Sequence, residues 1–252
     1  MPQPKAPSMR AEDMILTRPI AQSNRFAEAC RARFGNGLRI VISPLLRIVP
    51  RATQPDLDGI SGLVFTSANG VAAFASQSDD RNLPAWCVGD RTAEAARQVG
   101  FQAVSADGDR HALVALLAAH APVGRLLHLR GVKTAGNLAQ DLAKQGIETA
   151  THVIYDQAPL AFSEAATHLL SGSAPVIVPL FSPRTATLAA PVLGRANAPL
   201  CIAAMSPAVA ATIQVQSNVR VEVAVEPRSA AMLDAIATLR GSSRLERGVG
   251  PG

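Results

Sequence analysis

The chain repeats itself once, at a spacing of nearly half its length. The segment LTRPIAQSNRFAEACRARFG, which starts at Leu16, resembles LRGVKTAGNLAQDLAKQG, which starts at Leu129. FTSANGVAAFA and FSPRTATLAA match in the same way, as do CVGDRTAEAA and CIAAMSPAVA. The pairs Arg18–Arg130, Ser67–Ser182 and Cys87–Cys201 lie 112, 115 and 114 positions apart. One long repeat predicts two similar domains, because a solenoid would need a shorter period and more copies.

Short β-branched runs alternate with Ala-rich amphipathic segments. We expect strands at 14–16, 38–42, 63–65, 85–88, 103–104, 125–129, 152–155, 176–180, 200–203 and 219–223. Helical patterns cover 21–34, 93–99, 112–119, 135–145 and 230–239. Strands that alternate with helices form βαβ units, so the expected fold class is α/β with parallel sheets.

Composition agrees with helices packed on parallel sheets. Of the 252 residues, 48% are hydrophobic and only 4% aromatic, which suits one large core or two of ordinary size. The net charge of +5 favours anionic partners. Basic residues form no run with interleaved aromatic residues, so we expect a small polyanionic ligand and no nucleic acid.

The ends of the chain and its cysteines bear on localisation. The segment 1–12 lacks the apolar run of a secretory signal, and no 18 consecutive residues are apolar, so no membrane span is expected. We expect both tails, 1–12 and 241–252, to be disordered. The odd number of cysteines, without a CxxC pair, predicts buried structural thiols in a reducing cytoplasm: Cys30, Cys87 and Cys201.

Motifs for metals and nucleotides are missing from the sequence. The five histidines show neither HxxxH nor HExxH spacing, and His128 falls in an expected strand, where we expect it to be packed. No GxGxxG follows a strand, and no GxxxxGK[ST] occurs. We therefore expect no metal and no cofactor.

An ordered set of motifs resembles the uroporphyrinogen-III synthase family over about residues 13–240. The motifs are LTRP, FTSANGV, VGDRTAEAARQVGF, LHLRG before a helix, VIYDQAP, FSPRTA and AAMSPAVA. The resemblance implies two flavodoxin-like domains joined by a two-stranded linker near 42–51 and 152–157. One domain would comprise 1–46 and 157–252 and the other 47–156, with the active cleft between them.

The resemblance also implies a reaction. Such a cytoplasmic, monomeric lyase of heme biosynthesis would cyclise the linear tetrapyrrole hydroxymethylbilane to uroporphyrinogen III, with loss of water and inversion of the terminal pyrrole. That substrate is already reactive and closes to the wrong isomer unaided, so the enzyme would act mainly by the conformation in which it binds substrate. The alternative is a non-catalytic two-lobe binding protein or sensor for a small anionic ligand, because fold alone does not decide function.

Several turns between a strand and a helix could bind the substrate's carboxylates. Helix N-termini favour anions, and we place them after TSANG, VGDRT, LRGVKT, FSPRT and MSPAV. Their serines could bind ligand or simply cap the helix: Ser67, Ser182 and Ser206. Close backbone approach is expected at Asn69, Gly89 and Gly131. Ala203–Ala204 stands where the family often has glycine, which puts a contact there in doubt.

Cations at strand ends are the other candidates for carboxylate binding. Thr17 and Arg18 follow the first strand, and Arg130 holds the equivalent place in the second repeat. Lys133 and Arg184 lie just beyond strand ends, the edge where open α/β sheets bind ligands. Bidentate contacts would suit the arginines, although each cation could equally be a solvated surface charge.

Tyr155 is the only tyrosine in the chain. It matches the family's tyrosine beside the cleft, which implies that it helps the substrate's hydroxyl to leave. A phenol can donate a proton to departing water. The alternative is a packing residue whose hydroxyl is satisfied within the protein.

Overall fold

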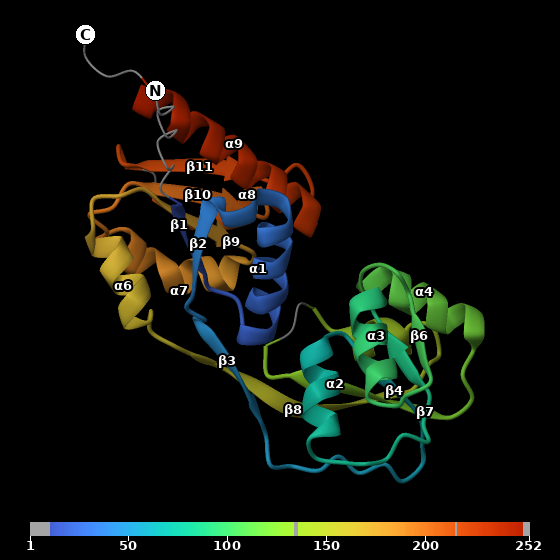
Figure 1. Ribbon diagram of the computed structural model, residues 1–252. Coiled ribbons are helices and arrows are strands. Elements are labelled where there is room, and N and C mark those ends of the chain that lie inside the picture. Colours follow the sequence, from blue (N-terminus) through green and yellow to red (C-terminus); the bar gives the residue numbers. More distant parts are fainter. Residues whose placement is uncertain (1–10, 134–135, 215, 249–252) are drawn as a thin grey trace, which may run out of the picture. The chain divides into compact units, whose positions relative to one another are not determined.

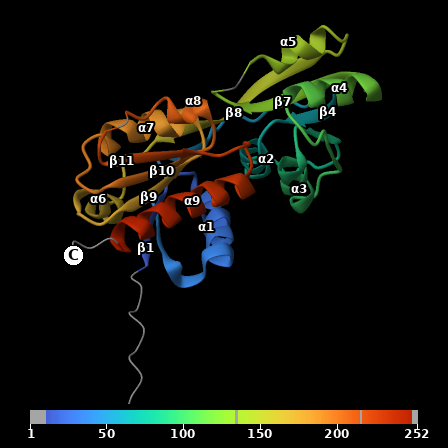
Figure 2. The same cartoon turned by 90° about the horizontal axis from the view of Figure 1, so that it is seen from above.

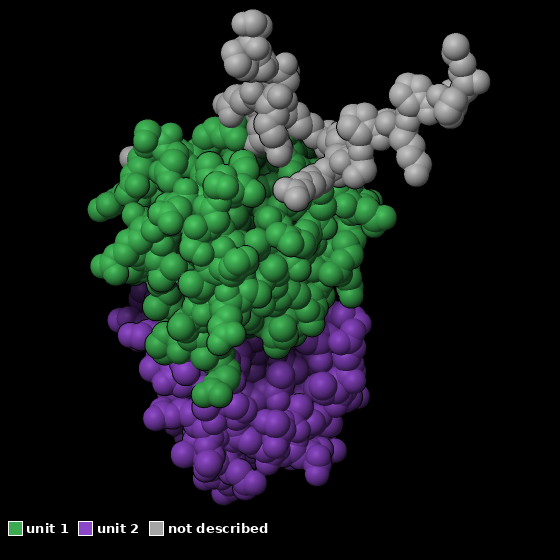
Figure 3. Space-filling view, turned by 60° about the vertical axis from the view of Figure 1, so that its left-hand side comes forward, with its two compact units in different colours: residues 1–47, 159–252 green, residues 48–158 purple. Residues whose placement is uncertain are grey.

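The computed structural model describes residues 11–133, 136–214 and 216–248. The chain forms two compact units, coloured separately in Figure 3. Unit 1 comprises Met1–Arg47 and Pro159–Gly252, and unit 2 comprises Ile48–Ala158. Unit 2 is therefore continuous in sequence, whereas unit 1 is built from both ends of the chain.

Unit 1 contains a five-stranded sheet of order β11-β10-β9-β1-β2, in which all four neighbouring pairs are parallel. Its strands are β1 (Glu12–Leu16), β2 (Leu38–Ile42), β9 (Val176–Leu180), β10 (Leu200–Ala204) and β11 (Val219–Val223). Every residue of β9 and β10 is buried, as expected of central parallel strands covered on both faces.

Helices cover both faces of this sheet, as Figure 2 shows. On one face, α6 (Glu164–Ser171), α7 (Pro183–Leu193) and α8 (Pro207–Ala210) pack on Ile15 and Val178. On the other, α1 (Ile20–Phe34) and α9 (Ser229–Gly248) pack on Met14 and Ile177. Alternate strand residues thus serve opposite layers.

Unit 2 contains a six-stranded sheet of order β3-β8-β7-β4-β5-β6. The pairs β7–β8, β4–β7, β4–β5 and β5–β6 are parallel. Its strands are β3 (Leu46–Pro50), β4 (Ile60–Phe65), β5 (Ala85–Cys87), β6 (Ala103–Ser105), β7 (Arg125–Gly131) and β8 (Thr149–Pro159). The expectation of an α/β chain is confirmed, and both sheets are rich in parallel strands.

Two cores flank the sheet of unit 2, whose strands β4, β7 and β8 are labelled in Figure 1. One lies under α2 (Ala68–Ala75) and α3 (Asp90–Gln98) and holds the rings of Phe65, Phe74 and Phe101, with centroids 5.7–6.3 Å apart. The other lies under α4 (Arg110–His120) and α5 (Leu138–Ala143). Apolar burial on both faces of one sheet gives the unit its own interior.

The strands matched by the sequence repeat have the same arrangement in both sheets but occur in a different order along the chain in each unit. The repeat matches β1 with β7, β9 with β4 and β10 with β5. The two sheets can be compared strand by strand, β2-β1-β9-β10-β11 with β8-β7-β4-β5-β6. Every matched strand then holds the same place in its sheet. Unit 2 is therefore a circular permutation of unit 1, with β3 added at one edge.

The chain passes from unit 1 to unit 2 within β3 and returns at the end of β8. These two strands are neighbours in the sheet. Backbone hydrogen bonds flank the crossing, from Arg51 N to Ile154 O and from Leu160 N to Leu45 O, both 2.9 Å.

Two expectations from the sequence need correction. The tails are shorter than expected, because Glu12 belongs to β1 and α9 continues through 241–248, where helix-forming residues follow Gly241. Residues 1–10 and 249–252 of the expected tails lie outside the described residues. Helix α5 begins at Leu138, after Gly136 with φ +76° and the capping residue Asn137, so the helical pattern expected at 135–145 is largely confined to six residues.

Candidate active site

Most of the candidate residues lie at the carboxyl-terminal edges of the sheets. In unit 1, Thr17 and Arg18 follow β1, Ser182 and Arg184 follow β9, and Ser206 follows β10. In unit 2 the corresponding residues follow β4, β5 and β7 or end β7, and Tyr155 lies on β8: Ser67, Asn69, Gly89, Lys133, Arg130, Gly131 and Tyr155. Parallel strands bring each set to one edge, where ligands of open α/β sheets bind.

Arg18 is held by an aromatic ring from a distant part of the chain. Its guanidinium carbon lies 4.2 Å from the centroid of Phe181, which follows β9. The backbone oxygen of Arg18 accepts a hydrogen bond of 2.8 Å from Ser23 Oγ. The half-buried cation is thereby oriented at the start of α1, a helix whose N-terminus has no side-chain cap and no acidic residue in its first turn.

The side chain of Thr17 is buried inside unit 1 and is not accessible to a ligand. The residue has no exposed surface, and among the described residues its hydroxyl oxygen has no hydrogen-bond partner. Its backbone oxygen accepts from Leu45 N at 3.0 Å. Its side chain therefore belongs to the interior beneath Arg18.

The three candidate serines differ in what their hydroxyls do. Ser67 caps α2 by accepting from Asn69 N at 3.1 Å, and Ser182 caps α7 by accepting from Thr185 N at 3.2 Å. Ser206 occupies the N-cap position of α8 without a side-chain capping bond. Gly89 holds the same position before α3, where the first turn carries Asp90. Arg184 lies in the first turn of α7 and is half-buried.

Ala203 and Ala204 lie inside β10 and are fully buried. Ala203 faces the layer of α1 and α9, and Ala204 faces the layer of α6 to α8. Their methyl groups fill the two cores of unit 1 and do not stand at the edge of the sheet.

Arg130 is the second-last residue of β7 and Lys133 lies two residues beyond the strand, and neither starts a helix. Arg130 Nη1 donates to the backbone oxygens of Gly131 at 3.0 Å and Val132 at 3.4 Å. Lys133 is exposed, five residues before α5 begins. The expectation that LRGVKT leads directly into a helix N-terminus is therefore wrong, because Gly136 turns the chain first.

Tyr155 is seated against the backbone of β7. A Cβ placed on Gly131 would lie 2.7 Å from Cε2 and Cζ of Tyr155 and 3.0 Å from its hydroxyl, so glycine is needed there. The tyrosine is 6% exposed. Burial raises the pKa of Tyr155 above its ordinary value, and a hydrogen bond with the Ser67 side chain partly offsets that effect.

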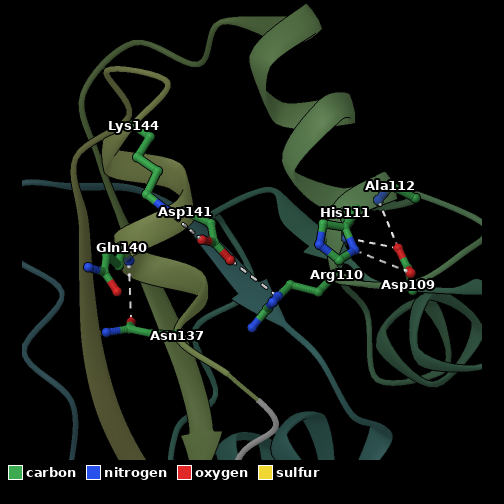
Figure 4. A network of polar contacts seen from close by, with 8 residues as sticks. All are labelled: Asp109, Arg110, His111, Ala112, Asn137, Gln140, Asp141 and Lys144. Atoms are coloured by element: carbon green, nitrogen blue, oxygen red, sulfur yellow. Dashed lines mark hydrogen bonds and ion pairs between the residues drawn. The ribbon is translucent and has the colours of Figure 1, made fainter.

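A polar pocket of about 520 Å³ lies beside Arg130 in unit 2. Its lining includes His128, Thr151, Asn137 and Gln140, which were not among the expected site residues. Figure 4 shows Asn137 accepting from Gln140 N at the start of α5, and Arg110 of α4 pairing with Asp141 of α5 at 3.2 Å. The available sequence signal was the two-residue spacing of His128 and Arg130, which puts both on one face of β7.

His128 is packed, as expected, with 3% of its surface exposed. Its Nε2 lies 3.2 Å from Thr66 Oγ1. Burial and the neighbouring Arg130 cation lower the pKa of His128 to about 4, so the imidazole is neutral at physiological pH. It adds no positive charge to the pocket.

The cysteines are buried, and burial raises the pKa of Cys30 and of Cys87 to about 12, which keeps both thiols protonated. In the described parts of the chain, no cluster of three or more His, Cys, Asp or Glu residues could hold a metal ion. Across the same residues, the helices are too short or too polar to cross a bilayer.

Two sheets rich in parallel strands, each with helices packed on both faces, define an α/β protein. The family model HEM4, uroporphyrinogen-III synthase HemD, matches residues 24–234. The chain belongs to the uroporphyrinogen-III synthase family, whose members are cyclising hydro-lyases of heme biosynthesis. No curated protein sequence matches it.

The fold resembles that of a solved structure with a TM-score above 0.5. Uroporphyrinogen-III synthetase from Helicobacter pylori is 14% identical, with a TM-score of 0.64, over 91% of this chain and 100% of that one. A mutant uroporphyrinogen III synthase from Thermus thermophilus is 15% identical, with a TM-score of 0.49, over 92% and 100%. The wild-type Thermus enzyme is 16% identical, with a TM-score of 0.42, over 92% and 99%.

Proposed function

We propose that this protein converts hydroxymethylbilane to uroporphyrinogen III and water, inverting the terminal pyrrole. The observation that carries the proposal is the family match, which spans both units from residue 24 to residue 234. It favours catalysis over the alternative of a binding protein or sensor.

The reaction needs conformational control more than strong acid–base chemistry. Electron release from the pyrrole nitrogen expels the terminal hydroxyl, and the resulting azafulvene is attacked by a carbon of the far pyrrole. Attack at the substituted carbon gives a spiro intermediate and then the inverted ring; attack at the free carbon gives the uninverted isomer. Holding the chain in the first geometry is catalysis by orientation.

The N-terminus of α1 is the strongest carboxylate site that we propose in unit 1. Arg18 is oriented beside it by Phe181, and a helix N-terminus stabilises an anion through its N–H groups and dipole. The N-terminus of α7, with Arg184 and Ser182, is a second site, and Ser206 has no capping bond to give up on binding ligand.

In unit 2, Arg130 and the exposed Lys133 supply positive charge at and beyond the end of β7. We propose that the backbone around Asn69 and Gly89 meets further carboxylates, although Asp90 weakens the second position. Tyr155 is the proposed proton donor to the leaving hydroxyl, since it is the residue of unit 2 that matches the family's tyrosine.

Finer features of architecture belong to the same proposal. The spatial order shared by both sheets is 2-1-3-4-5 in the chain order of unit 1, which supports two flavodoxin-like units. Pairing of β3 with β8 at the crossing supports a two-stranded linker. We further propose a cytoplasmic monomer that binds no nucleic acid, consistent with buried, protonated thiols.

The test is to incubate the protein with hydroxymethylbilane generated enzymatically and to resolve the oxidised porphyrin isomers. A synthase yields the type III isomer in excess of the spontaneous type I product. Binding of substrate without any change in the isomer ratio would support the binding protein instead.

A further inference from the structure

Polar side chains of the neighbouring strands β7 and β8 gather on one face of the unit 2 sheet. His128 of β7 is in register with Val64 of β4, whose side chain belongs to the core under α4 and α5. On its other side, His128 is in register with Thr151 of β8. Arg130 lies two residues further along β7 and therefore on the same face as His128. His128, Arg130 and Thr151 all line the pocket of about 520 Å³.

The start of α5 supplies the rest of the polar lining. Asn137 Oδ1 accepts from Gln140 N at 3.3 Å, a bond drawn in Figure 4, which leaves the Asn137 Nδ2 group as a donor. The Gln140 side chain is exposed and makes no hydrogen bond with another described residue. Leu138, which is 3% exposed, adds an apolar part to the same lining.

His128 has one ring nitrogen without a partner. Its Nε2 lies 3.2 Å from Thr66 Oγ1, whereas its Nδ1 is buried and has no hydrogen-bond partner among the described residues. When the Thr66 hydroxyl donates to Nε2, the neutral ring carries its proton on Nδ1, which is then a buried donor without an acceptor. Leaving such a donor unpaired is unfavourable, so a ligand that brings an acceptor is stabilised here.

The described lining of the pocket contains one cation and no acidic residue. Arg130 Nη1 donates to backbone oxygens of its own loop, while its Nε and Nη2 have no partner among the described residues. Asp141 of α5 pairs with Arg110 at 3.2 Å and with Lys144 at 3.4 Å, so its negative charge is compensated. Since His128 is neutral, the positive charge of the pocket is that of Arg130.

We propose that this pocket is a carboxylate-binding site, in which Arg130 donates from Nε and Nη2 and His128 donates from Nδ1. The side chains of Asn137, Gln140 and Thr151 supply further uncharged donors. One cation among neutral donors matches the single charge of a carboxylate better than the larger charge of a phosphate. Cavities of about 300–1,000 Å³ bind whole small molecules, so the carboxylate belongs to a larger organic acid.

The source of the carboxylate rests on the proposed function, whereas the site itself does not. If the chain is a synthase, the carboxylate is an arm of hydroxymethylbilane, and free propionate then competes with that substrate and raises its KM at unchanged kcat. Propionate that binds without changing either constant assigns the site to a free organic acid. Wild-type protein without synthase activity would refute the proposed function, while propionate binding would still decide the site.

Propionate binding to the full chain tests the site without any activity measurement. Propionate and propionamide have nearly the same shape, but only propionate is charged. At neutral pH we expect propionate to shift the ring nitrogen resonances of His128, which are those missing from His128→Gln, with the proton on Nδ1 at saturation. Propionamide and inorganic phosphate should bind about tenfold more weakly. Equal binding of propionamide, tighter binding of phosphate, unshifted His128 resonances or a proton on Nε2 would overturn the proposal.

A charge placed in the lining tests the location of the site. Gln140→Glu adds a negative charge but keeps the fold, because a glutamate three residues after the capping Asn137 favours the start of α5. We expect the affinity for propionate to fall about tenfold. The matched control is Gln145→Glu, the same change at an exposed residue that follows α5 and lies outside the described lining. Equal losses in the two variants would contradict binding in this pocket, because general repulsion would then explain both.

Discussion

The side chains that carry the proposed chemistry owe their orientation to residues distant in sequence. Arg18, Ser67 and Tyr155 could be identified from their motifs, and the repeat placed Arg18 and Arg130 after equivalent strands. Their partners could not be predicted, because the Phe181 ring and the Gly131 backbone reach them only through folding. For the same reason, the burial of Thr17 was not visible in the LTRP motif.

Removing the Tyr155 hydroxyl should slow catalysis but leave the fold intact. We expect Tyr155→Phe to lower the rate of type III formation at saturating substrate by about 10-fold to 100-fold, the lower range for a general acid, since the pyrrole nitrogen drives the ionisation. Because the ring keeps its place against Gly131, stability should change by no more than about 1 kcal/mol. A wild-type rate with an unchanged melting temperature would make Tyr155 a packing residue.

Removing the Arg18 cation should weaken binding more than turnover. Arg18→Ala deletes an interaction shared by substrate and transition state, so KM should rise about tenfold while kcat changes less. The control is Arg33→Ala, which removes an exposed cation of α1 that pairs with Asp234 at 3.0 Å. If both variants raise KM equally, general electrostatic attraction is responsible, and Arg18 has no specific role.

At the scale of elements, local signals predicted strands better than helix starts. β2, β9 and β11 have the expected bounds, and each run rich in β-branched residues meets Gly37, Pro175 or Ala224 at one of its ends. Helix α5 was expected too early, since the signal at Gly136 is a turn and not a helix interior. The pocket at β7 was also missed, because it needs Thr151 of the neighbouring strand.

The buried His128 of β7 should make stability fall in acid. Its folded-state pKa of about 4 lies below the unfolded value, so protons bind preferentially to the unfolded chain. The contribution of neutral His128 to the free energy of unfolding is complete above the pKa of histidine in the unfolded chain. It is lost as the pH falls toward the folded-state pKa of about 4. Between about pH 7 and about pH 5 the loss should be about 2 kcal/mol. Urea unfolding of wild type and His128→Gln at both pH values measures it, and equal pH dependence in the two proteins would contradict the assignment.

At the scale of the whole molecule, the repeat was the most informative feature of the sequence. It predicted two similar domains, and the sheet orders show how the two differ. If the strands of unit 1 are numbered 1 to 5 along the chain, their counterparts in unit 2 occur along the chain in the order 3-4-5-1-2. The circular permutation could not be predicted from composition, because permuting the strands changes neither the pattern of each strand nor the residues of the core.

Unit 2 should fold without unit 1. Residues 48–158 contain both of its apolar cores and the strands β4 to β8, apart from the last residue of β8. We expect the isolated segment to give dispersed amide resonances and one cooperative unfolding transition. An unfolded segment would mean that β3, which it lacks in part, is required for its sheet.

If this chain decides which isomer forms, the isomer ratio must depend on protein concentration. Spontaneous closure of hydroxymethylbilane to type I competes with the enzyme in every sample. We expect the type III fraction to rise with protein concentration until it dominates, and Tyr155→Phe to reach the same plateau at a higher protein concentration. A type III fraction that stays at the protein-free value at every concentration would contradict this expectation.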